Sequence, residues 1–156
     1  MKKIPALIIL VFIFSFFNSA CKKGNNSNGP DSDVTTIIPT GSKMKINIGS
    51  QIYRATLYEN AAAAAFKALL PMTLDMADLN NNEKHFDLPR TLPVNSSNPG
   101  TIQTGDLMLY GSSTLVLFYK GFNTSFSYTR LARVDDISGL ADALGSTNVR
   151  VTYQLD

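Results

Sequence analysis

The sequence has one cysteine, one histidine and no tryptophan, and each scarcity excludes a class of protein. A single cysteine cannot form a disulfide within the chain, so the folded part must be stable through its core alone. The single histidine, His85, cannot build a usual zinc site without free cysteines, and no catalytic triad can be identified around it, so we expect it at the surface. Without an EF-hand loop, Asp135 and Asp136 are weak candidates for calcium or magnesium. We therefore expect no metal and no cofactor.

Neither sign of charge is in excess once the N-terminus is set aside. The chain has 14 Lys and Arg against 12 Asp and Glu. Lys2 and Lys3 belong to a segment that we expect to be removed, which leaves 14 − 2 = 12 basic residues against 12 acidic ones. Nucleic-acid binding usually requires a basic patch or stripe. We therefore expect no nucleic-acid partner.

The one long hydrophobic run lies at the N-terminus. It covers residues 4–17, follows Lys2 and Lys3, and is followed by small or polar residues at 18–20. The run is short for a membrane-spanning helix, whereas a basic start, an apolar stretch and small residues before a cleavage site are typical of a secretory signal peptide. Residues 1–20 are therefore predicted to be a signal peptide.

Cys21 directly follows Ser19 and Ala20, which resembles the lipobox of bacterial lipoproteins, although Asn18 occupies a position where an aliphatic residue is usual. The alternative is an ordinary signal peptide cut near Ala20 that leaves a free thiol. We favour lipidation, because an unpaired reactive cysteine in an exported protein is otherwise hard to explain. Each buried acyl CH₂ contributes about 0.8 kcal/mol, so two or three chains would hold the protein on a membrane of the bacterial cell envelope.

Residues 21–42 are rich in Asn, Ser, Gly and Pro and are predicted to form a flexible tether behind the lipidated cysteine. The folded domain is expected at residues 43–156. Its central feature is residues 105–120, which predict two strands joined at Gly111. Both faces of these strands are apolar, so both must be covered, as in a closed or double-layered sheet.

Apolar alternation and turn residues predict the rest of the domain. Strands are expected at residues 43–48, 52–57, 72–79, 83–88, 128–137 and 149–155, short helices at 61–70 and 139–144, and loops at 94–104 and 121–127. About eight strands and two short helices indicate a mainly β protein with a closed β-barrel.

Several ordered blocks carry a resemblance to a known family: MKINIGSQIYRATLYEN, FKALLPMTLDMADLNNNEK, PGTIQTGDLMLYGSSTLVLFYK and SYTRLARVDD. Between residues 43 and 144 the chain resembles the bacterial cyclophilin-like domain family. The resemblance implies a closed eight-stranded barrel with a helix at each end.

The resemblance does not imply an enzyme. True cyclophilins isomerise X-Pro bonds, but Leu115 and Leu117 stand where the resemblance places their glutamine and an active-site phenylalanine, and Tyr128 stands near the histidine position. No residue matches the catalytic arginine, which polarises the twisted amide. We therefore expect a non-catalytic binding module for a peptide segment or small ligand. The alternatives are an exported peptidyl-prolyl isomerase with a rewired site and a structural subunit of an envelope assembly.

The candidate ligand-binding residues lie around the loop at 121–127. Tyr119, Phe122, Phe126 and Tyr128 would form an aromatic wall for a proline-containing or extended peptide or another hydrophobic ligand; equally, they would cap the barrel end.

Arg130 is the candidate polar group of this site. It shares a predicted strand face with Tyr128, Ala132 and Val134, which would bring a guanidinium to the barrel mouth to clamp a carboxylate or a peptide carbonyl. The alternative is an arginine paired with Asp106 or Glu83, because buried arginines are usually paired.

Overall fold

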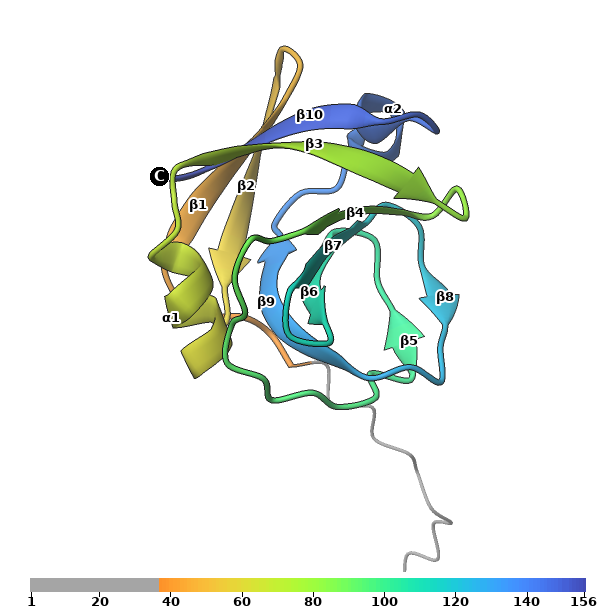
Figure 1. Cartoon of the computed structure of the whole chain (residues 1–156). Coiled ribbons are helices and arrows are strands. Elements are labelled where there is room, and N and C mark those ends of the chain that lie inside the picture. Colours follow the sequence, from red (N-terminus) through yellow and green to blue (C-terminus); the bar gives the residue numbers. More distant parts are fainter. Residues whose placement is uncertain (1–36) are drawn as a thin grey trace, which may run out of the picture. The chain divides into compact units, whose positions relative to one another are not determined.

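The computed structural model of the chain describes residues 37–156 and shows a closed antiparallel barrel of eight strands (Figure 1). Around the barrel the strands follow the order β1, β10, β3, β4, β7, β6, β9, β2. They are β1 Lys43–Ile48, β2 Gln51–Leu57, β3 Met72–Leu79, β4 Glu83–Asp87, β6 Asp106–Tyr110, β7 Thr114–Phe118, β9 Tyr128–Val134 and β10 Val149–Leu155. The predicted mainly β barrel is confirmed. The predicted signal peptide, residues 1–20, and Cys21 lie outside the described residues.

Two very short strands form a second layer beside the barrel. They are β5 Thr101–Ile102 and β8 Phe122–Asn123, which pair antiparallel with each other. Both lie within segments predicted as loops, because two residues are too few to produce a visible alternation of apolar and polar side chains. This small sheet matters for the site, since it brings Ile102 and Phe122 against the outer face of the barrel.

Two helices lie at opposite ends of the barrel (Figure 1). α1 Ala61–Lys67 begins where the Asn60 side chain accepts a hydrogen bond of 2.8 Å from the Ala63 amide. Its buried Phe66 packs edge-on against Tyr153, with ring centroids 6.0 Å apart. α2 Leu140–Leu144 buries a leucine at each of its ends. None of the helices within residues 37–156 has the length and apolar character needed to cross a membrane.

The central strands β6 and β7 are buried on both faces. Leu107, Leu109, Leu115 and Leu117 belong to the main core cluster inside the barrel. The alternate residues Met108, Val116 and Phe118 form a second cluster with Ile102 and Tyr128 on the outer face. This arrangement confirms the double coverage that the sequence predicts, and the outer cluster forms the floor of the candidate site.

Backbone hydrogen bonds to β2 begin two residues before β1. The Gly41 amide donates a hydrogen bond of 2.9 Å to the Leu57 carbonyl, and the Leu57 amide donates one of 3.0 Å to the Ser42 carbonyl. A Cβ at Gly41 would lie 2.6 Å from the Leu57 oxygen, so only glycine fits this approach. The last residues of the segment predicted as tether therefore pack on β2.

Candidate functional site: a groove on the outer face of the barrel

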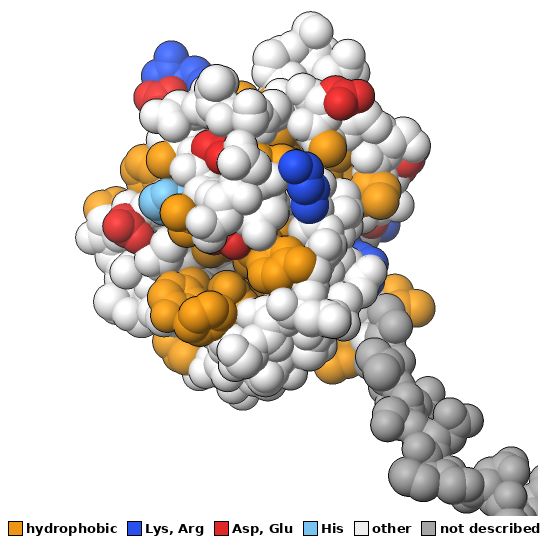
Figure 2. All heavy atoms as spheres, turned by 90° about the vertical axis from the view of Figure 1, so that its right-hand side faces the viewer, with side chains coloured by type: hydrophobic (Ala, Val, Ile, Leu, Met, Phe, Trp, Pro, Cys, Tyr) orange, Lys and Arg blue, Asp and Glu red, His pale blue; other side chains and the backbone are white. Residues whose placement is uncertain are grey.

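A groove of about 290 Å³ lies on the outer face of the barrel, over β4, β7 and the end of β6. It is lined by Leu79, Asn80, Asn82, Glu83, His85, Tyr110, Thr114, Val116, Phe122, Phe126 and Tyr128. Figure 2 shows hydrophobic side chains gathered on this side of the molecule, near the chain's one histidine. A mostly apolar hollow with a few convergent polar groups is the usual form of a binding site.

Strand alternation builds the floor of the groove. In β4, Glu83 and His85 point outward into the groove, while Lys84 between them pairs with Leu117 and points inward. In β7, Val116 points outward directly opposite His85. Because successive side chains of a strand alternate between faces, three neighbouring residues of β4 contribute to two different environments.

Five rings in contact form a row through the floor and wall of the groove, called here the aromatic row: Phe126, Tyr110, Tyr128, Phe118 and Phe122. All of them except the fully buried Phe118 line the groove. Neighbouring ring centroids are 6.1, 5.6, 5.5 and 5.7 Å apart in that order. The Tyr110–Phe126 and Phe118–Tyr128 pairs are close to perpendicular, at 89° and 87°. Edge-to-face contacts of this kind contribute about 0.5–1.5 kcal/mol each beyond area burial, so the wall is held in shape before a ligand arrives.

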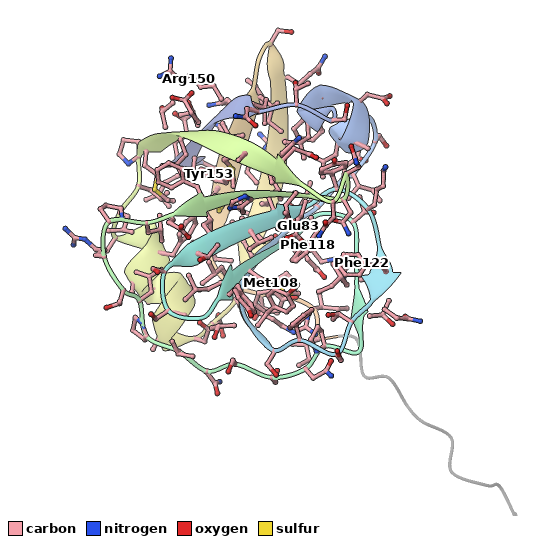
Figure 3. The ribbon with its side chains drawn as sticks, turned by 45° about the vertical axis from the view of Figure 1, so that its right-hand side comes forward. Glu83, Met108, Phe118, Phe122, Arg150 and Tyr153 are labelled. Carbon is pink, nitrogen blue, oxygen red and sulfur yellow. The ribbon has the colours of Figure 1, made fainter. Side chains whose placement is uncertain are left out.

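Glu83 is the charged carboxylate of the groove. It lies directly opposite Phe118 in the β4–β7 ladder, and Figure 3 shows it beside Phe118 and Phe122. The residue is 8% exposed. Burial, reinforced by the nearby Asp78 carboxylate, raises the pKa of Glu83 above its ordinary value, and no hydrogen bond from the described residues offsets that effect. Burial and the Glu83 charge likewise raise the pKa of Tyr128.

Three of the aromatic residues predicted for ligand binding line this groove: Phe122, Phe126 and Tyr128. Phe122 is positioned by the small second sheet through β8, Tyr128 by the barrel strand β9, and Phe126 by the loop between them. Phe126 is 58% exposed, whereas Tyr128 is 7% exposed and serves as part of the floor.

Tyr119, also predicted for ligand binding, lies elsewhere, in a buried network. Its hydroxyl donates a hydrogen bond of 2.6 Å to Asp78 Oδ1, and the fully buried Lys84 Nζ donates to the same oxygen at 2.5 Å and to the Thr147 carbonyl at 2.7 Å. The hydrogen bond from Lys84 lowers the pKa of Asp78. Burial and the bond to Asp78 raise the pKa of Tyr119 to about 12. This network fixes the packing of the barrel interior.

Arg130 is also separated from the groove. Its guanidinium Cζ lies 5.9 Å from the centroid of the Tyr58 ring, in a second hollow of about 300 Å³ that Asn60 and Asn95 also line. The predicted pairing with Asp106 is made by Arg133 instead, at an Nε–Oδ1 distance of 3.8 Å.

A β-bulge in β9 divides the predicted face: Arg130 shares a face with Tyr128 as expected, but not with Ala132 and Val134. Met108 pairs with Arg130, but the preceding Leu107 pairs with Ala132, so Leu131 is an extra residue in the strand. The bulge leaves Arg130 on the outer face with Met108 and moves Ala132 to the interior. Strict alternation from the sequence cannot foresee that change of face.

Of the three residues that the resemblance placed at cyclophilin positions, Tyr128 lines the groove, whereas Leu115 and Leu117 face away from it. Leu115 and Leu117 point into the barrel core, while their neighbours Val116 and Phe118 face outward. The sequence interpretation missed Glu83, His85 and Tyr110 as groove residues. The sequence does indicate that Glu83 and His85 lie together, because they are two residues apart in a predicted strand and therefore share a face. Within residues 37–156, no group of three or more His, Cys, Asp or Glu side chains could hold a metal ion.

The closed eight-stranded antiparallel barrel and its two helices define a cyclophilin-like β-barrel protein. The model of the cyclophilin-like family matches residues 46–154, and the chain belongs to this family. A hypothetical protein from Archaeoglobus fulgidus, known from its solution structure, has a similar fold with a TM-score of 0.51 and 13% sequence identity, over 74% of this chain and 95% of that one. No curated protein matches the sequence.

Proposed function

We propose that this cyclophilin-like domain is a membrane-tethered binding module that holds an extended peptide segment in the outer groove, without catalysing a reaction. The observation that carries the proposal is the groove itself, an apolar hollow of about 290 Å³ walled by the aromatic row. Aromatic rings supply a large contact area at a low cost in side-chain entropy, which suits recognition of apolar or proline-containing segments.

The openness of the groove favours a peptide over an enclosed small ligand. Tyr110 is 46% exposed and Phe126 is 58% exposed, so this side of the groove is open to solvent. Small-molecule sites usually bury about 70–90% of their ligand, which requires walls on most sides. An extended chain instead needs one wall and a floor, and this groove offers both.

The position of Arg130 favours binding without catalysis. Isomerisation of an X-Pro bond must lower a barrier of about 18–20 kcal/mol, and in true cyclophilins an arginine beside the apolar groove polarises the amide. Neither an arginine nor a lysine lines the groove. Arg130, the sequence-based candidate, faces Tyr58 in the separate hollow.

The membrane tether is the second part of the proposal. The sequence supports it through the hydrophobic run at residues 4–17 and the cysteine that closes the cleavage region. Metabolic labelling with a palmitate analogue is expected to label the exported chain at Cys21. Labelling that persists in Cys21→Ser would refute lipidation at this residue.

Selection of displayed peptides on the full chain tests the binding role. We expect enriched peptides to share aromatic or proline residues, and Phe126→Ala to weaken a selected peptide at least tenfold, about 1.4 kcal/mol, as for an interface anchor. The control is Ile52→Ala, since Ile52 is 65% exposed at the opposite hairpin. No enrichment, or equal loss in both variants, would refute this site and favour the structural role. Accelerated X-Pro isomerisation by the same preparation would refute the absence of catalysis.

A further inference from the structure

Glu83 places a carboxylate in the floor of an otherwise mostly apolar groove, which is unusual. The other side chains that line the groove include His85 but no aspartate, lysine or arginine, so Glu83 supplies the one carboxylate of this lining. The residue is more than nine-tenths buried, yet no described group donates a hydrogen bond to it, and burial raises its pKa. The Glu83 oxygens are not among the fully buried unpaired atoms of residues 37–156, so they reach the water of the groove. Burial of the rest of the side chain still makes the charged form less favourable than it is in water.

The surroundings of Glu83 favour a positive charge as its missing partner. The Asp78 carboxylate, which is paired with Lys84, lies within electrostatic range of Glu83, and four rings of the aromatic row line the same groove. Ring faces attract cations, and a carboxylate in a poorly hydrated site attracts them more strongly than one in water. An anionic ligand would meet repulsion from the same groups.

We infer that the groove selects peptide segments that carry a lysine or arginine side chain, with Glu83 as the acceptor for its charged head. This specificity rests on the proposed function. The apolar stem of such a side chain lies along the aromatic row, while its N–H groups donate to the Glu83 carboxylate. Glu83, Phe122 and Tyr128 line the same groove, so one side chain can place its stem on the rings and its head on the carboxylate.

A matched set of peptides tests the inference. The full chain is placed in phosphatidylcholine nanodiscs, and fluorescence anisotropy measures binding of labelled acetyl-Pro-Phe-Lys-amide. The comparison peptides replace lysine with norleucine, which keeps the stem and removes the charge, or with glutamate, which reverses it. We expect the lysine peptide to bind at least about tenfold more tightly than the norleucine peptide, because hydrogen bonds to charged groups are strong.

Two variants assign the preference to Glu83. Glu83→Gln should bring the lysine peptide to the affinity of the norleucine peptide and leave the norleucine peptide unchanged. Glu59→Gln is the matched control, since Glu59 is exposed and is absent from the groove lining. It should keep the wild-type preference.

The outcomes separate this inference from the proposed function. Equal binding of the lysine and norleucine peptides to the wild type would overturn the inference and leave a groove that binds peptides by their apolar parts. A lysine preference that survives in Glu83→Gln would also overturn it. Binding of none of the three peptides would overturn the inference, while the selection experiment on displayed peptides decides the proposed function separately.

Discussion

Replacing Glu83 with glutamine should make the free protein more stable at neutral pH. Burial raises the pKa of Glu83 above its usual value of 4.5, so the folded state holds the proton more tightly than the unfolded state. Below pH 4.5 both states are protonated and the site carries no penalty. As the pH rises through the folded-state pKa, this stability is lost, and the loss is complete above that pKa. Glutamine has no charge to desolvate, so the variant escapes this loss.

The size of the effect follows from the partial desolvation of the Glu83 charge, which glutamine lacks. Removing a polar group from water without full compensation costs about 1–3 kcal/mol. Glu83 lies in a groove that is open to water, so the lower end applies, at about 1 kcal/mol. In a domain of this size, about 1 kcal/mol shifts the melting temperature by roughly 3–5 °C.

Thermal unfolding of the full chain at pH 7 and pH 3 measures the effect. Glu83→Gln should melt several degrees above the wild type at pH 7 and close to it at pH 3, while the control Glu59→Gln should match the wild type at both. A Glu83→Gln variant that is less stable than the wild type at pH 7 would show that the carboxylate has a stabilising partner, and the reasoning about its cationic ligand would fail.

Two further predictions concern the Lys84–Asp78–Tyr119 network. Lys84→Met should lower the free energy of unfolding, measured in urea, by about 3 kcal/mol, because it removes the ammonium from Asp78 and leaves the Thr147 carbonyl without its donor. Combining Lys84→Met with Asp78→Asn should recover part of this loss. An unchanged urea midpoint in the single variant would contradict the stabilising role of the pair. The unfolded state loses the Tyr119 proton above pH 10 while the folded state keeps it until about pH 12, so stability falls as the pH rises through that window. Tyr119→Phe should make this fall shallower in urea titrations between pH 9 and 12, and identical slopes would count against it.

The barrel was predictable from the sequence because its determinants are local. The alternation in residues 43–48, 72–79 and 149–155 matches the observed strands residue for residue. The helix predicted for residues 61–70 starts correctly at Ala61, where Asn60 supplies the cap, but ends at Lys67. Helix ends depend on packing against the barrel, which the sequence pattern does not encode.

The site was only partly predictable because it depends on long-range placement. The Phe122, Phe126 and Tyr128 cluster could be recognised as consecutive aromatics in a polar loop, and these three residues do meet in the groove. The extra residue at Leu131 reverses the strand face after Arg130, and nothing local in the sequence marks it. Predicting the role of Glu83 would have required knowing that β4 lies beside β7, and these two strands are distant in the chain.

The location of bound peptide tests the central claim most directly. Methyl NMR spectra of the full chain in nanodiscs are recorded during titration with a selected peptide. Val116 lies in the groove floor and Leu79 at its edge, whereas Ile37 and Ile38 line the separate hollow beside Arg130. The account predicts saturable shifts at Val116 and Leu79 with Ile37 and Ile38 unchanged. Shifts confined to Ile37 and Ile38 would place the binding site at Arg130 and contradict it.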